Sequence, residues 1–131
     1  EQQPDYVKCS VDDCGYTSVW DQFKKELKED FDLPAFPLMH TTSLLCDWVY
    51  DWNFKEASAL EQVKKCQLPM LFIHGDKDDY VPTWMVYELY KAKPEPKELW
   101  TVPNADHATS YKLNKQEYTE KVKQFTDKYI R

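Results

Sequence analysis

An acidic turn and a later histidine are the residues of this sequence best suited to chemistry. Residues 68–82 read Leu-Pro-Met-Leu-Phe-Ile-His-Gly-Asp-Lys-Asp-Asp-Tyr-Val-Pro, and His107 follows within Pro-Asn-Ala-Asp-His-Ala. A carboxylate that accepts the Nδ1 proton of a histidine fixes the tautomer of the ring. It also stabilises the imidazolium that forms when the ring takes a proton from a nucleophile. Asp78 and His107 are therefore the candidate acid and base of a hydrolase.

The nucleophile that would complete this pair has no counterpart in the sequence. A serine hydrolase with its acid and base in this order carries the serine upstream, on a tight Gly-x-Ser-x-Gly turn. The chain has only two glycines, Gly15 and Gly75, and no serine is flanked by glycines. We therefore expect the nucleophile and the oxyanion hole to lie outside these 131 residues, and the chain alone to be inactive.

The elements that must position the two residues alternate between strands and helices. Strands are predicted at residues 6–11, 69–74 and 98–102, and helices at 19–30, 38–50, 58–65, from 82, and 114–129. This order predicts one α/β domain over residues 1–131, with about three parallel strands in chain order and helices around them. Chemistry in such sheets gathers at the carboxyl ends of the strands, which lie roughly 4.8 Å apart. The loop with Asp78 and the loop with His107 can then touch.

Two helices carry the sequence pattern of a capping box at their first turn. Ser58 is followed by Glu61, and Asn114 by Glu117. In this motif the first side chain accepts a hydrogen bond from the backbone N–H three residues on. We expect both pairs to fix the start of their helices.

The helix predicted at 38–50 is apolar around most of its circumference. Such a helix either belongs to a core or covers a ligand cavity. The side chains expected to be buried are Met39, Leu44, Leu45, Trp48 and Val49.

The acid turn resembles that of a known family. The pattern His-Gly-x-x-Asp-x-x-Val-Pro is matched at every defined position, by His74, Gly75, Asp78, Val81 and Pro82. The resemblance runs from Tyr6 to Ile130 and is to the carboxyl-terminal half of an α/β-hydrolase fold serine hydrolase. More narrowly, the chain resembles bacterial esterase-like or peptidase-like members.

The resemblance implies a function and a set of site residues. Asp78 takes the place of the triad acid and His107 that of the general base. Hydrolysis of a carboxylic ester of a small molecule is the implied reaction, with an amide or peptide bond as the second choice, and no cofactor or metal is implied. The region 36–54 corresponds to a lid or cap, which makes Trp48 and Trp52 candidate substrate-binding residues. Simple core packing of the same aromatic side chains is the competing interpretation.

Two other classes of function stay open at this point. Carboxylates and imidazoles suit divalent metal ions, and a metal-dependent hydrolase would use His74, Asp76, Asp78, Asp106 and His107. That set is short of histidines, since only His40 is left. The other alternative is a non-catalytic interaction module built on half a hydrolase. For His74 itself the expected role is structural, with its ring bonded to nearby backbone.

The amino-acid composition limits the classes of partner and cofactor that the chain can bind. The net charge is −6, which argues against nucleic acid because that partner demands clustered Lys and Arg. Aromatic residues make up 15% of the chain and provide material for a packed core. The four cysteines lack Cys-x-x-Cys spacing, so free, partly buried thiols are expected rather than disulfides or zinc.

The amino-terminal strand is expected to mediate association. The sequence starts at Glu1 rather than Met, which favours a piece cut from a longer chain. If the preceding half is missing, the 6–11 strand has a bare edge that invites pairing with a second copy or with that half. We find no signal peptide and no apolar run near 18 residues. The cellular location therefore stays open between the cytoplasm, which is slightly favoured, and a secreted or membrane-tethered parent.

Overall fold

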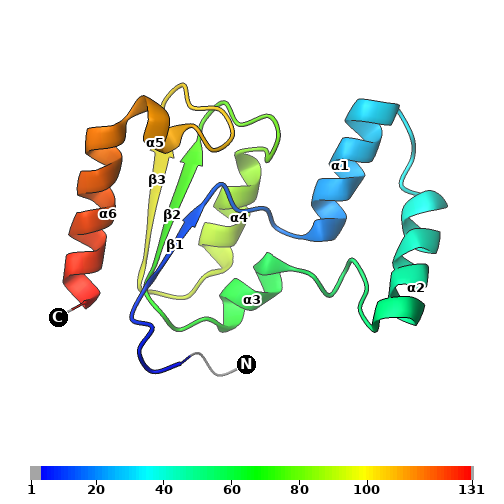
Figure 1. The fold of residues 1–131 in the computed structure, drawn as a ribbon, viewed down its shortest axis with the longest axis horizontal. Coiled ribbons are helices and arrows are strands. Elements are labelled where there is room, and N and C mark those ends of the chain that lie inside the picture. The colour runs from blue at the N-terminus through cyan, green and yellow to red at the C-terminus, as the bar shows by residue number, and fades with distance from the viewer. Residues whose placement is uncertain (1–3, 131) are drawn as a thin grey trace.

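Three parallel strands with helices on both sides form the fold, as the alternation of elements predicts (Figure 1). The computed structural model describes residues 4–130. The elements are β1 (Ser10–Asp13), α1 (Val19–Phe31), α2 (Leu38–Tyr50), α3 (Ala59–Lys65), β2 (Met70–Gly75), α4 (Trp84–Ala92), β3 (Lys97–Val102), α5 (Ser110–Leu113) and α6 (Lys115–Tyr129). The strands lie in the order β1-β2-β3, and β2 pairs in parallel with both neighbours.

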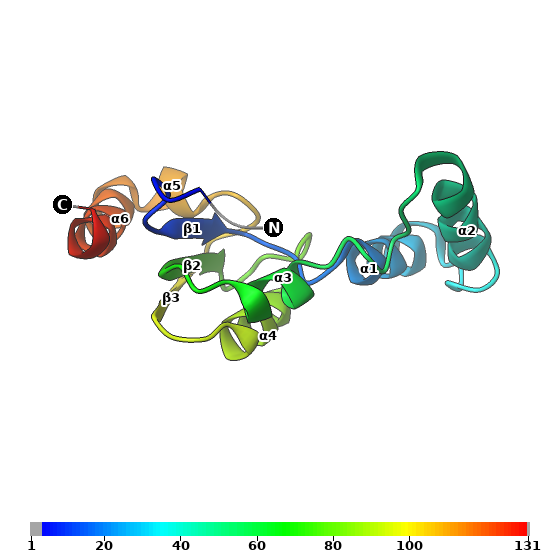
Figure 2. The same ribbon diagram turned by 90° about the horizontal axis from the view of Figure 1, so that it is seen from below.

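The central strand β2 is buried along its whole length, which explains its unbroken apolar sequence. Side chains alternate between the faces of a strand. Phe72 therefore packs towards α3 and α4, with Val86 and Leu89. Ile73 packs on the opposite face against Phe125 of α6. Figure 2 shows α5 and α6 on one side of the sheet and α3 and α4 on the other. Both faces of the sheet are covered, so a packed core supports the strand ends that carry the site.

The first strand is shorter and later than predicted. It begins at Ser10, not at residue 6, and ends at Asp13. The backbone N–H of Val7 bonds to the carbonyl of Pro4, so these residues form a turn instead of a strand. Pairing with the sheet starts where the N–H of Ser10 donates to the carbonyl of Pro69. Within the described part of the chain the outer edge of β1 has no neighbouring strand.

Helices α1 and α2 extend away from the sheet as an arm (Figures 1 and 2). The prediction that the apolar residues of α2 are buried is wrong for most of them. Met39 is buried, but the exposed large side chains of this helix include Leu44, Leu45, Trp48, Val49 and Tyr50. These side chains are exposed because no element among residues 4–130 lies over the outer face of α2.

Both predicted helix starts are confirmed, but the predicted side-chain capping bond forms at only one of them. The Ser58 hydroxyl accepts from the N–H of Glu61 at 3.2 Å, as expected. The side chain of Asn114 makes no capping bond. A short helix, α5, lies within the predicted loop, and the N–H of Asn114 bonds to Ser110 at its end. Asn114 therefore both ends α5 and precedes the first residue of α6, where its carbonyl accepts from the N–H of Tyr118 at 2.8 Å.

The four cysteines form no disulfide within the described residues. None of the helices between residues 4 and 130 has the length and apolar character needed to cross a bilayer.

Candidate active site

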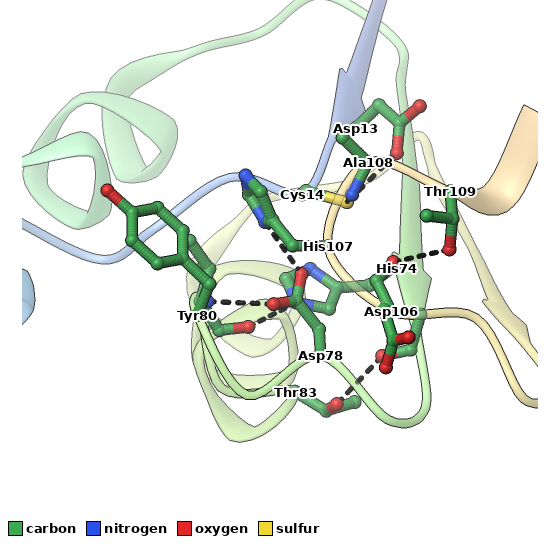
Figure 3. A network of polar contacts seen from close by, with 12 residues as sticks. Asp13, Cys14, His74, Asp78, Tyr80, Thr83, Asp106, His107, Ala108 and Thr109 are labelled. Atoms are coloured by element: carbon green, nitrogen blue, oxygen red, sulfur yellow. Dashed lines mark hydrogen bonds and ion pairs between the residues drawn. The ribbon is translucent and has the colours of Figure 1, made fainter.

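The carboxylate of Asp78 lies at the carboxyl end of β2, buried and fully engaged (Figure 3). Its side chain has no exposed surface. One oxygen, Oδ1, accepts from the N–H of Val81 at 2.8 Å, which closes the acid turn. The other, Oδ2, lies 2.9 Å from Nδ1 of His107. The predicted acid and base are therefore brought together by adjacent strand ends.

The side chain of His74 contacts the same acid turn that holds Asp78. Its Nε2 lies 2.8 Å from the carbonyl of Val81 and 3.4 Å from Oδ2 of Asp78. Because a carbonyl can only accept, Nε2 carries the proton and donates to Val81. The expected structural role of His74 is confirmed, and its imidazole holds the backbone that in turn holds Asp78.

The loop that carries His107 is tied to the acid turn by backbone contacts. Asp76 accepts from the N–H of Asn104 at 2.6 Å, and the N–H of Lys77 donates to the carbonyl of Ala105 at 3.1 Å. The two segments approach so closely at Gly75 that a Cβ there would lie 2.1 Å from the Ala105 oxygen. A glycine is therefore required by space at this position. These ties fix the distance between the acid and the base.

A second tie holds the far side of the histidine loop and was missed from sequence. The N–H of Ala108 donates to Sγ of Cys14 at 3.3 Å. The Cys14 thiol donates to Oδ1 of Asp13 at 3.2 Å, and the Tyr118 hydroxyl donates to the other oxygen of Asp13 at 2.9 Å. Burial raises the pKa of the Cys14 thiol to about 12, so it stays protonated. No local pattern links Cys14 to His107, since they come from distant parts of the chain.

The imidazole of His107 is buried on its acid side and open on the other. Its side chain is 36% exposed, and the ring of Tyr80 packs against it at 4.9 Å between centroids. A carboxylate only accepts, so in the neutral ring Nδ1 carries the proton and Nε2 carries the lone pair. No described residue bonds to Nε2. This nitrogen is thus available to take a proton from an external group.

The metal-site alternative is not supported in its predicted form. Among residues 4–130, the side chains whose ligand atoms come within 4.8 Å of one another are those of Cys14, His74 and Asp78. Asp76 and Asp106 are exposed and stand outside this group. The five residues of the predicted set are therefore not brought together as one group of ligands.

A cavity of about 330 Å³ opens beside His107. Its lining includes Tyr16, Gln22, Phe23, Glu26, Tyr80 and His107. The aromatic residues predicted to bind substrate do not contribute to it. Trp48 is 85% exposed on α2, and Trp52 packs against Phe54 at 5.9 Å. The structure therefore does not bring Trp48 and Trp52 to His107.

The serines of the chain have other roles or positions. Ser18 and Ser58 cap helices α1 and α3, and Ser43 accepts from the N–H of Phe54. Ser110 is completely buried, and Ser10 begins the edge strand. None of the five forms a hydrogen bond with His107 in the described part of the chain.

Comparison with solved structures defines the class: the fold is that of the α/β hydrolases. A Pyrococcus furiosus esterase superposes with a TM-score of 0.67 at 18% identity, covering 98% of this chain and 47% of that one. An acylaminoacyl peptidase of Pyrococcus horikoshii gives a TM-score of 0.63 at 18% identity, with 95% and 20% covered. The expected fold is confirmed.

Sequence comparison places the chain within this class. The profile of the prolyl oligopeptidase family matches residues 1–131, and the chain belongs to that family of serine hydrolases. It is also similar to the uncharacterized protein YqkD of Bacillus subtilis, with 32% identity over 117 residues. That match covers 89% of this chain but 38% of the Bacillus protein. The chain thus spans well under half the length of this relative.

Proposed function

We propose that this chain supplies the acid and the base of a serine hydrolase that cleaves carboxylic esters of small molecules. The observation that carries the proposal is the 2.9 Å contact from Nδ1 of His107 to the buried carboxylate of Asp78. The open Nε2 and the adjacent cavity support it further. Amide or peptide bonds are the second choice of substrate, in line with the peptidase among the structural neighbours.

In the proposed mechanism, a serine from polypeptide outside this sequence attacks the carbonyl of the ester. Nε2 of His107 takes the hydroxyl proton and later donates it to the leaving alcohol. Asp78 stays ionised, holds the ring in place and stabilises the imidazolium. The acyl group is now bonded to the serine oxygen, and water activated by His107 in the same way cleaves this bond, which releases the acid and restores the serine. Because both residues sit on backbone tied at several points, the base is oriented before substrate arrives.

The isolated chain is proposed to be inactive. This follows from the roles of its serines, since those at residues 18, 43 and 58 are engaged in capping or backbone bonds. The exposed apolar residues of the 36–54 segment fit a cap over the active site in a longer protein. The open edge of β1 is proposed to pair with that longer protein's remaining sheet, or with a second copy of the chain.

A fluorophosphonate probe tests the proposal. It labels serines activated by a neighbouring base, so a longer polypeptide that contains this chain should be labelled and the 131-residue chain should not. The variant His107→Ala should abolish labelling of the longer polypeptide, while His40→Ala, on the arm, should not. Labelling of any serine within residues 1–131 would overturn the proposal.

The association is tested separately by light scattering. The chain at high concentration should exceed the mass of a 15.7 kDa monomer. Replacing exposed Val11 at the open edge with proline should return it to a monomer, because proline removes a donor from the strand. A stable monomer at every concentration would count against the pairing.

A further inference from the structure

A residue that lines the cavity beside His107, Gln22, has a buried acceptor that lacks a donor among the described residues. Gln22, on α1, is 6% exposed, and its Nε2 donates to Oε1 of Glu26 and to the carbonyl of Tyr80, both at 2.8 Å. Both partners are acceptors, so the amide cannot be turned round without placing oxygen against oxygen. Its Oε1 is buried and accepts no hydrogen bond from the described residues. Buried polar atoms are rarely left in this state.

The carboxylates of the cavity are also without cations. Glu26 receives hydrogen bonds from Gln22 and from the Tyr80 hydroxyl, which are both neutral. The nearby negative charge of Glu26 and this hydrogen bond raise the pKa of Tyr80. The adjacent lysine on α1, Lys25, pairs with Glu29 at 2.8 Å, donates to the carbonyl of Tyr80 at 3.2 Å and lies 5.9 Å from the centroid of the Tyr80 ring. It forms no ion pair with Glu26 in the described part of the chain.

Asp13 lines the same cavity in a similar state. Its oxygens accept from a thiol and a phenol. No lysine or arginine lines the cavity, and His107 is its one basic side chain among the described residues. Among the described residues, neither Glu26 nor Asp13 is therefore neutralised by an ion pair with a cation inside the cavity next to His107.

The remaining walls suit a cation as well. The rings of Tyr16, Phe23 and Tyr80 line the cavity. Aromatic ring faces are electron-rich and attract ammonium groups within about 6 Å of the centroid. An anionic ligand would meet two carboxylates here, and a purely aliphatic one would leave the orphan amide oxygen unpaired.

We propose that this cavity binds a protonated amine of the substrate, held by Glu26, the amide oxygen of Gln22 and the surrounding rings. The identification of the cavity as a substrate site rests on the proposed function. The substrate class is then an ester that carries a primary or secondary ammonium group. The N–H donors satisfy Gln22, and the charge is balanced by Glu26.

Ligand binding to the 131-residue chain tests the inference without any turnover. The probes are benzylammonium, benzyl alcohol and phenylacetate, which share a ring but differ in charge. Two-dimensional NMR titration should show benzylammonium shifting the signals of Tyr16, Phe23 and Tyr80. Its Kd should be about tenfold lower than that of benzyl alcohol, as expected for one charge-assisted hydrogen bond. Phenylacetate should bind most weakly.

A matched pair of variants separates the specific contact from overall charge. Glu26→Gln should raise the Kd of benzylammonium about tenfold and leave benzyl alcohol unchanged. Glu117→Gln, on exposed α6, removes the same charge and should change neither ligand. The variants' spectra report whether they remain folded, and the comparison of the three ligands on the unaltered chain stands without them.

Several outcomes would overturn the inference: equal binding of benzylammonium and benzyl alcohol, stronger binding of phenylacetate, or an unchanged Kd in Glu26→Gln. Its failure is distinct from failure of the proposed function. If benzylammonium binds but the fluorophosphonate probe does not label the longer polypeptide, the hydrolase proposal fails and the cation site stands. If the probe labels the longer polypeptide but benzylammonium does not bind, the cation site fails and the hydrolase proposal stands.

Discussion

Replacing Gly75 by alanine should separate the acid turn from the histidine loop. The new Cβ would lie 2.1 Å from the carbonyl oxygen of Ala105, whereas ordinary contact begins at 3.4 Å. The obstacle is backbone, so it cannot rotate aside, and the loop must move by more than 1 Å. This shift strains the bond from Lys77 to Ala105 and the bond from Asn104 to Asp76.

The cost can be worked from these contacts. Overpacking costs about 1–3 kcal/mol, and a backbone obstacle places this site at the upper end. One weakened hydrogen bond adds about 1 kcal/mol. The total of roughly 3–4 kcal/mol should lower the Tm by on the order of 10–15 °C for a domain of this size. Calorimetry or thermal denaturation followed by circular dichroism measures this directly.

The second glycine gives a matched control. At Gly15 the added Cβ would approach Asp12 at 2.4 Å, but the obstacle is the end of a side chain that can turn away. Burial raises the pKa of the Asp12 carboxyl, so releasing it towards water removes an unfavourable term. Gly15→Ala should therefore cost less than about 1 kcal/mol. An equal or larger loss of stability than in Gly75→Ala would refute the reasoning.

Three further predictions concern Cys14 and the acid turn. Iodoacetamide at pH 8 should modify Cys14 far more slowly than half-buried Cys46, because Cys14 is buried and its thiol, with a pKa of about 12, stays protonated. Peptide mapping measures the two rates, and equal rates would contradict this prediction. The folded chain keeps the Cys14 proton that the unfolded chain releases near pH 9, so the free energy of unfolding should fall as pH rises from 9 to 12, and less steeply in Cys14→Ala; parallel pH curves would disagree. In a longer active protein, Asp78→Asn should lower kcat by on the order of 10⁴-fold and Asp79→Asn, at an exposed position, should do little; if the two effects were exchanged, the acid would be misassigned.

The parts of the fold that could be predicted are those written in local patterns. The continuous apolar run 69–74 predicts a strand covered on both faces, and β2 is buried throughout. The acid turn follows it directly, and parallel pairing places the end of β3 beside it. Strand spacing alone was therefore enough to predict that Asp78 and His107 lie within reach of each other.

The parts that could not be predicted depend on what lies across space. The apolar circumference of α2 predicts burial, but periodicity does not say which element covers it, and Trp48 is exposed. The contact from Ala108 to Cys14 joins residues 94 positions apart, and no short motif encodes it. The orphan oxygen of Gln22 likewise exists only because α1 meets the turn that carries Tyr80.

The position of the proton on the His107 ring tests the central claim most directly. Long-range ¹H–¹⁵N NMR at a pH where the ring is neutral distinguishes a proton on Nδ1 from one on Nε2. A charge-assisted bond to buried Asp78 is worth about 1.5 kcal/mol for a ring that is partly exposed, which favours the Nδ1–H form by roughly tenfold. The account predicts Nδ1–H in the unaltered chain and loss of that preference in Asp78→Asn. A proton on Nε2 in the unaltered chain, or identical spectra for the two proteins, would contradict it.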